Sequence, residues 1–522
     1  MRKVLALLGV TWAVGGCSGG AAQAPAPDRC AAATFPAKPA AASRALYVAA
    51  SCGGDGATPA TPVGTIAAAL AVATPGTAVL VAPGTYAENV RIEQPSIWLL
   101  GADEGASGEA PPVVIAAPEP YAVSVKAAGS GAVLRGLHVK SPVGVGIWVA
   151  GAGTEAAPVR VEASRVDGAT APAAQPYGYG IMGIGSKGLV VTNTDIRDSA
   201  GVGFLIGESS VVMTRSHVSG SGKGGVRAES SNAEKGQRGV VLEGNTIEGN
   251  REYGLALFST TAVVGGASEA SANTIRGTVM GQVSGDGVIV APLQGGASRV
   301  EVQIEGNRIE GNARTGALVS AVSASGPRGI VLARNLIGTN GSVGSEAAAS
   351  AHFGAGVWVQ GAAGAAGVGG DVGVVLRANT VSGNSHVGIG MMGAARGRVE
   401  ANQIANTASG TIRDDLTLAT VTLGDGVSIQ SKAVAAVEGN DVRACFRLGA
   451  LFDDAGSGTT VRNNVIAATS GRGVVLQNTP RALIGEGGNT DGSGALSALE
   501  VPAGTYGTQK ASLGGVVTSA GP

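Results

Sequence analysis

The sequence predicts an all-β solenoid, a coil of short strands whose successive turns stack along one axis. A degenerate repeat runs from about residue 139 to residue 466, with its clearest copies at 242–257 and 304–319. Self-similarity at a period of roughly 20 to 50 residues is typical of solenoids. The composition agrees, because 87 of 522 residues are glycine and only 3% are aromatic, which suits many tight corners around a thin interior. Long helical periodicity is absent from the repeat.

Each copy of the repeat has an isoleucine or valine at one fixed position. We use this residue, the anchor, to measure the spacing between copies. The spacing between these anchors ranges from 22 residues (Ile196 to Val218) to 44 residues (Ile337 to Val381). The shortest spacing accommodates one turn of three short strands with tight bends, so the longer copies must contain inserted loops. The twelve anchors are Val139, Val166, Ile196, Val218, Ile247, Ile275, Ile309, Ile337, Val381, Ile404, Val442 and Ile466.

Asparagine stands two residues before the anchor in eight of the twelve copies, and a second small polar residue follows three residues after it. Because the turns of such a coil stack ~4.8 Å apart, equal positions lie above one another. We expect the stacked amides to form hydrogen-bonded ladders. This structural role is favoured over a ladder of sugar contacts. The eight asparagines are Asn245, Asn273, Asn307, Asn335, Asn379, Asn402, Asn440 and Asn464.

The N-terminus predicts export. Arg2 and Lys3 precede an apolar stretch at 4–14 that is too short to span a membrane, so residues 1–16 are interpreted as a signal peptide. Small residues directly before Cys17 resemble the lipobox of bacterial lipoproteins. The resemblance implies that Cys17 is lipidated and that the protein is anchored in the bacterial cell envelope. Ordinary secretion with a chance cysteine is the alternative.

Residues 17–45 are rich in alanine and proline and predict a flexible tether. Cys30 and Cys52 lie in the tether and just after the first expected strand. Since an exported protein is in a compartment that permits disulfides, we expect these two to be bridged. Cys445 falls at a ladder position and is expected to be a buried, inert thiol.

Residues 46–100 form an N-terminal module with its own motifs. Gly53-Gly-Asp-Gly56 follows the first strand, Thr65-Ile66 opens an alanine-rich stretch, and Pro83-Gly-Thr-Tyr86-Ala-Glu88 follows a second strand. This module resembles the first turn of bacterial surface β-helix proteins. The repeat resembles the right-handed parallel β-helix of the pectin-lyase-like superfamily. The resemblance implies a single-stranded β-helix over 46–485 with a capping helix at about 63–73.

Function follows less directly, because this superfamily includes lyases, hydrolases, epimerases and adhesins. Four copies carry insertions at one corner of the coil, after Val166, Ile275, Ile337 and Ile404. Loops from one corner share one side of a solenoid, and that side is often the binding face. The candidate binding residues in or beside these loops are Tyr177, Tyr179, Asp286, His352, Asp414, Asp415 and Asp425.

The fourth insertion offers the best candidate for chemistry. Asp414, Asp415 and Asp425 form an acidic group that can hold Ca²⁺, which prefers carboxylate oxygens. Resemblance to polyuronate lyases implies that Arg413 is then the catalytic base. The alternative is a solvated surface loop, because aspartate before glycine is common at turns. Motifs typical of polygalacturonases and alginate epimerases are absent apart from an isolated Asn193-Thr-Asp195.

With a net charge of −1 and a charged fraction of 14%, nothing in the sequence suggests a basic face for nucleic acid. The sequence therefore predicts a lipid-anchored β-helix that presents an extended binding surface to glycans or other envelope components. The alternatives are a Ca²⁺-dependent lyase or epimerase acting on an acidic polysaccharide, and a structural spacer. Residues 486–522 are expected to form a C-terminal cap or a partly disordered tail.

Overall fold

A computed structural model provides the coordinates. The signal peptide, Cys17, Tyr177, His352, Asp414 and Asp415 lie outside the described residues, so the predictions made for them stay predictions. No helix within the described ranges is long and apolar enough to cross a membrane. The structure describes residues 30, 32–102, 112–118, 120–140, 142–171, 178–231, 239–282, 284–293, 301–320, 329–341, 353–361, 373–413, 420–467 and 469–509.

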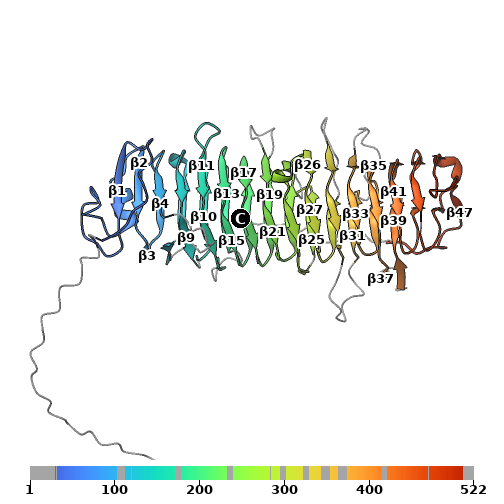
Figure 1. The fold of residues 1–522 in the computed structure, drawn as a ribbon, viewed down its shortest axis with the longest axis horizontal. Coiled ribbons are helices and arrows are strands. Elements are labelled where there is room, and N and C mark those ends of the chain that lie inside the picture. Colours follow the sequence, from blue (N-terminus) through green and yellow to red (C-terminus); the bar gives the residue numbers. More distant parts are fainter. Residues whose placement is uncertain are drawn as a thin grey trace, which may run out of the picture.

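The chain winds into a right-handed parallel β-helix, which confirms the predicted fold class. Each complete turn contributes one strand to each of three long sheets, and each strand pairs in parallel with the equivalent strand of the next turn. Figure 1 shows the turns stacked along one axis, from β1 (Arg44–Val48) to β47 (Leu499–Val501) at the opposite end.

Sheet A has 16 strands and sheet B has 14 among the described residues. The strands of sheet A are β1, β2 (Thr77–Val81), β5 (Trp98–Leu100), β8 (Val133–Arg135), β11 (Val159–Glu162), β14 (Leu189–Thr192), β17 (Val211–Thr214), β20 (Val240–Glu243), β23 (Thr261–Gly265), β26 (Glu301–Glu305), β29 (Ile330–Ala333), β32 (Val374–Arg377), β35 (Arg396–Glu400), β40 (Val434–Glu438), β43 (Thr460–Arg462) and β46 (Gly485–Gly487). Those of sheet B are β3 (Gly84–Tyr86), β6 (Val113–Ile115), β9 (Leu137–Lys140), β12 (Arg165–Asp167), β15 (Asp195–Arg197), β18 (His217–Ser219), β21 (Thr246–Glu248), β24 (Thr274–Arg276), β27 (Arg308–Glu310), β30 (Leu336–Gly338), β33 (Thr380–Ser382), β36 (Gln403–Ala405), β41 (Asp441–Arg443) and β44 (Val465–Ala467).

Sheet C has 15 strands in the described part of the chain, and its last member continues the coil beyond the predicted boundary at residue 485. Its strands are β4 (Val90–Ile92), β7 (Val123–Lys126), β10 (Val145–Ala150), β13 (Tyr179–Ile184), β16 (Val202–Gly207), β19 (Gly224–Glu229), β22 (Tyr253–Phe258), β25 (Asp286–Ala291), β28 (Thr315–Ser320), β31 (Ala355–Gln360), β34 (Val387–Met392), β39 (Asp425–Gln430), β42 (Ala450–Asp453), β45 (Val474–Gln477) and β47. The described chain runs on past β47 to residue 509, and residues 510–522 lie outside it.

The predicted register is confirmed at every anchor. Each of the twelve anchors lies in sheet B directly beside the anchor of the next turn, from Val139 beside Val166 to Val442 beside Ile466. All twelve point into the coil and are at most 3% exposed. Burying this stack of branched apolar side chains provides the main driving force for winding the chain.

The predicted asparagine ladder runs through the corner between sheets A and B. The Nδ2 atom of Asn307 donates to Oδ1 of Asn335 at 3.1 Å, and Asn335 donates likewise to Asn379 at 3.0 Å. The ladder extends one turn beyond the prediction, since Asn464 donates to Asn489. Shorter runs link the second polar column, as between Asn312 and Asn340. Each asparagine side chain forms hydrogen bonds with buried backbone N–H and C=O groups at the corner. These groups would otherwise lack a partner, because the chain leaves the sheets there.

The N-terminal module owes its shape to the motif after β2. Glu88 accepts hydrogen bonds from the backbone N–H groups of Ile66 and Ala67, at 2.8 Å each, at the start of helix α1 (Ile66–Ala71). Thr65 caps the same end through its side chain. This helix is shorter than the predicted 63–73, and its role as a cap of the coil stays a prediction. Among the described residues, three short 3₁₀ turns are also present, at Ala127–Gly129, Glu269–Ser271 and Arg481–Leu483.

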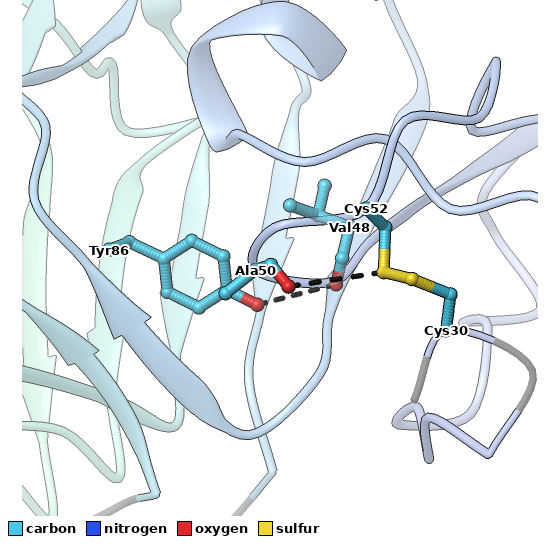
Figure 2. The surroundings of a disulfide bond; sticks show 5 residues. All are labelled: Cys30, Val48, Ala50, Cys52 and Tyr86. Carbon is cyan, nitrogen blue, oxygen red and sulfur yellow. Dashed lines mark hydrogen bonds between the residues drawn. A yellow bond between two sulfur atoms is a disulfide. The ribbon is translucent and has the colours of Figure 1, made fainter. Parts of the chain in front are cut away.

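The predicted disulfide between Cys30 and Cys52 is present, with the two Cα atoms 5.8 Å apart. Figure 2 shows it beside the loop after β1, where the Tyr86 hydroxyl donates to the carbonyl of Val48. Phe35 packs edge-on against Tyr47 with ring centroids 5.1 Å apart. The end of the predicted tether therefore lies against the first turn of the coil.

The outer face of sheet C is covered. Six consecutive strands of this sheet, from β22 to β39, are buried at every residue, so side chains pack on both of their faces. Part of the cover comes from the fourth insertion, which forms an antiparallel hairpin of β37 (Gly410–Arg413) and β38 (Thr420–Leu423). Ile412 and Leu423 of this hairpin pack against a cluster that includes Phe353 and Trp358. Sheet B, in contrast, keeps a polar outer face.

Candidate functional site

The outer face of sheet B carries columns of charged side chains. Its strands are mostly three residues long, so the anchor points inward while its two neighbours point outward. Because equivalent positions of successive turns stack, the residues that directly follow the anchors form a column along the axis of the coil. Glu248 stands beside Arg276, and Arg276 beside Glu310, so charges of opposite sign alternate from turn to turn.

His217 lies on this face in β18, between carboxylates of the preceding and the following turn. Its Nδ1 atom is 3.2 Å from Oδ1 of Asp195, and its Nε2 atom is 3.0 Å from Oε1 of Glu248. Nε of Arg276 donates to the other Glu248 oxygen at 2.7 Å, and Arg197 lies 2.5 Å from Asp195. A chain of five ionisable groups therefore links four consecutive turns.

The interactions within this group of five side chains shift the pKa values of several of its members. The hydrogen bond to Asp195 raises the pKa of His217, and the interaction with Glu248 adds to it. Burial alone would raise the pKa of Asp195, but hydrogen bonds from His217 and Arg197 outweigh it and lower the pKa. The Arg276 hydrogen bond lowers the pKa of Glu248. The carboxylates of Asp195 and Glu248 and the imidazole of His217 are therefore charged together in mildly acidic solution.

A shallow groove of about 710 Å³ opens on this face beside His217. It spans the five turns from β18 to β30, about 19 Å along the axis at ~4.8 Å per turn. Gly249 and Gly277, with φ of 61° and 63°, end their strands in the left-handed conformation and leave the floor free of side chains. The groove is lined by Ser219, Gly220, Glu248, Gly249, Arg276, Gly277, Glu310 and Thr339.

The stability of the coil is expected to depend on pH through His217. Because its pKa is raised on folding, the charged imidazole stabilises fully below pH ~6.5 and loses this contribution as the pH rises through the raised value. The ion pairs are partly exposed, so we expect an effect of at most about 1 kcal/mol. Urea unfolding of the wild type and of His217→Gln at about pH 5.5 and 8.5 measures it. Equal pH dependence in the two proteins would contradict this role.

The structure places two of the predicted site residues inside the molecule. Asp286 is fully buried, and its two oxygens accept from Nε and Nη2 of Arg314 at 2.9 and 2.5 Å. Asp425 is 1% exposed and is held in the same way by Arg447, at 2.7 and 2.5 Å. Burial raises the pKa of Asp425, and the Arg447 guanidinium opposes that shift. Both carboxylates therefore bind arginines from the following turn and do not face solvent.

The remaining predicted residues do not gather into one described site. Tyr179 is 9% exposed and belongs to the apolar cluster over sheet C. Arg413 ends β37, at the tip of the hairpin, and its side chain lies outside the described part of the structure. Within the described ranges, no group of three or more His, Cys, Asp or Glu side chains is arranged to hold a metal ion. Asp425, occupied by Arg447, does not fit the role of a Ca²⁺ ligand.

Comparison with known proteins identifies the family. The family described as right handed beta helix region matches residues 121–353 and 350–487, about 70% of the chain, since (487 − 120)/522 is 0.70. The chain belongs to the right-handed β-helix family. No curated protein matches this β-helix chain in sequence.

Solved structures resemble this β-helix chain in fold alone. The A-module of an Azotobacter vinelandii mannuronan C-5 epimerase is 16% identical, with 81% of this chain and 92% of that one covered and a TM-score of 0.42. The catalytic domain of an alpha-1,3-glucanase is 14% identical, with 88% and 70% covered and a TM-score of 0.42. A periplasmic alginate epimerase is 12% identical over 70% of this chain and 76% of that one, with a TM-score of 0.40.

Sequence reasoning missed the charged face of this β-helix. Asp195, His217 and Glu248 were not singled out for a site, although each directly precedes or follows an anchor. Reading the outward positions beside the anchors as columns would have found the alternation of sign. The signal lies in the repeat itself, outside the insertions that contain most of the predicted site residues.

Proposed function

We propose that this β-helix protein is anchored in the bacterial cell envelope and binds a hydroxyl-rich glycan along the groove of sheet B. The groove supports the proposal because it is open, extends over five turns and presents charged and hydroxyl groups at regular spacing. Charged side chains form strong hydrogen bonds with sugar hydroxyls. A bare backbone floor at Gly249 and Gly277 leaves room for a chain to lie along the axis.

The charges of the groove favour a neutral glycan over an acidic one. The charges that line the groove are compensated, because Arg276 binds Glu248 and Arg308 forms an ion pair with Glu310. A polyanion therefore gains no net electrostatic attraction there. The Ca²⁺-dependent lyase considered as an alternative depended on Asp425, whose oxygens are taken by Arg447. Envelope anchoring through Cys17 is part of the proposal and depends on the N-terminal motif alone.

Removing the groove ion pair tests the proposal. We expect the double substitution Glu248→Ala and Arg276→Ala to weaken binding of a neutral oligosaccharide at least about tenfold, because two charged hydrogen-bonding groups are lost. Glycans that bind the full-length chain would first be selected on an array, and the affinity then measured by isothermal titration calorimetry.

The control is the ion pair of Asp441 and Arg443, which occupies the outward positions of sheet B on either side of the anchor Val442, outside the groove. Its double alanine variant should bind like the wild type. Equal loss in both double variants, or a preference for acidic glycans that the groove variant keeps, would contradict the proposed function.

A further inference from the structure

A second open cleft, separate from the groove, lies near the C-terminal end of the coil. It has a volume of about 490 Å³, and its wall includes Phe446, Arg447, Ser470, Arg472 and Tyr506. This volume falls in the range of roughly 300–1,000 Å³ that is typical of small-molecule sites. The cleft combines aromatic and cationic side chains, which the groove of sheet B does not.

Phe446 is held in an exposed position by a fixed backbone. Its ring side chain is 48% exposed, although a phenylalanine of this kind is ordinarily buried. Its N–H donates to the carbonyl of Thr407 at 3.0 Å, which ties it to the preceding turn. Gly424 lies against it so closely that an added Cβ would be 2.7 Å from Cβ of Phe446. The neighbouring chain therefore supports the base of the side chain and leaves its surface open.

The two arginines of the cleft differ in their surroundings. Arg447 is compensated by Asp425 and also donates from Nη1 to the carbonyl oxygens of Gly507 at 2.8 Å and Thr422 at 3.2 Å. Its guanidinium lies 5.9 Å from the centroid of the Tyr506 ring. Arg472 is exposed, and within the described residues its guanidinium makes no ion pair. The cleft therefore holds one uncompensated positive charge beside an exposed aromatic ring.

We propose that this cleft binds a small ligand in which a carboxylate is attached to a ring. The guanidinium of Arg472 provides a planar, two-pronged donor for the carboxylate. Phe446 provides an apolar surface against which the ring packs, and Ser470 provides a hydroxyl at the rim. Acidic sugars and aromatic acids both have this chemistry. The site is independent of the groove and of the function proposed for it.

Titration of the full-length chain with paired ligands tests the site. Glucuronate and benzoate represent the two classes of ligand in which a carboxylate is attached to a ring, and glucose and benzyl alcohol are their neutral counterparts. Saturation-transfer NMR titrations are expected to show at least one acid binding about tenfold more tightly than its neutral counterpart, since the acid forms a charge-assisted pair. The acid with the lower Kd identifies the class.

Two substitutions separate the contributions of the cleft. Arg472→Gln is expected to remove the preference for the acid, and Phe446→Ala to weaken binding of both members of the pair several-fold. Arg91→Gln and Val72→Ala, exposed positions at the opposite end of the coil, serve as matched controls. Thermal melting confirms that each variant is folded.

The proposal is overturned if neither acid binds, if acid and neutral ligand bind equally, or if the cleft variants behave like the controls. Binding of glucuronate that only the groove variants abolish would also overturn it and would place acidic sugars in the groove. Loss of acid binding in Arg472→Gln while the groove variants stay unaffected supports the cleft, whatever the outcome for the proposed function.

Discussion

Replacing Asn335 by alanine is expected to lower the free energy of unfolding by about 2–4 kcal/mol. Oδ1 of Asn335 accepts from both the backbone N–H and the Nδ2 of Asn307, at 3.0 and 3.1 Å. Its own Nδ2 donates to the carbonyl of Ile304 at 2.8 Å. Asn335 is 1% exposed, so water cannot replace these partners. The variant therefore leaves a buried donor and a buried acceptor unsatisfied at one corner of the coil.

Urea unfolding followed by circular dichroism measures the loss as a lower midpoint. Gln403→Ala is the matched control, because Gln403 points outward from sheet B and follows directly after the ladder residue Asn402. A surface substitution of this kind should change the free energy by less than about 0.5 kcal/mol. If the two variants unfold alike, the ladder would not stabilise the coil.

The fold could be predicted in detail because the repeat is a one-dimensional pattern. Every turn must return Ile or Val to the inside of sheet B, so counting residues between anchors also counts turns, whatever the length of the loops. The asparagine ladder could be predicted for the same reason, because asparagines at the same distance in sequence from their anchors must lie above one another. The bridge from Cys30 to Cys52 spans 22 residues, and both partners were visible near the first strand.

The site could be predicted less well. Its residues come from different turns of the coil, and these turns differ in length. His217 lies 22 residues from Asp195 and 31 from Glu248, and such separations vary along the coil. Asp425 was interpreted as a metal ligand because it closes the same insertion that contains Asp414 and Asp415. The partner that defines its role is Arg447. This residue lies one turn later in the chain, after strands β40 and β41, although its side chain contacts Asp425 directly. Local sequence patterns thus predicted the turns of the coil. The side-chain contacts of the site depended on which residues of successive turns lie beside one another.

The cleft near the C-terminus was hidden for a related reason. Tyr506 comes 60 residues after Phe446 in the chain and lies beyond the last recognisable repeat. Residues 486–522 had been expected to form a cap or a partly disordered tail, so no contact with a particular turn was predicted. The hydrogen bond between Arg447 and Gly507 shows how the last described residues attach to the coil.

Substituting Arg447 by leucine is expected to destabilise the C-terminal turns by about 3–5 kcal/mol, because it leaves the carboxylate of Asp425 buried without its partner. The substitution also removes the hydrogen bonds to Gly507 and Thr422 that hold the C-terminal segment and the hairpin. Urea unfolding measures the free energy, and limited proteolysis detects the release of the C-terminal segment. The deficit should shrink as the pH falls towards about 4, since a protonated carboxyl group is easier to bury.

A double substitution distinguishes the buried charge from the lost hydrogen bonds. When both Asp425 and Arg447 are leucine, no charge is left unpaired, so the double variant should be more stable than Arg447→Leu alone. Arg314→Leu is the matched control, because Arg314 holds the buried Asp286 in the same way but lies far from the C-terminal segment along the chain. It should show the loss of stability without the release of the C-terminal segment. A double variant no more stable than Arg447→Leu would mean that these two carbonyl contacts, and not the charge pair, fasten the end of the coil.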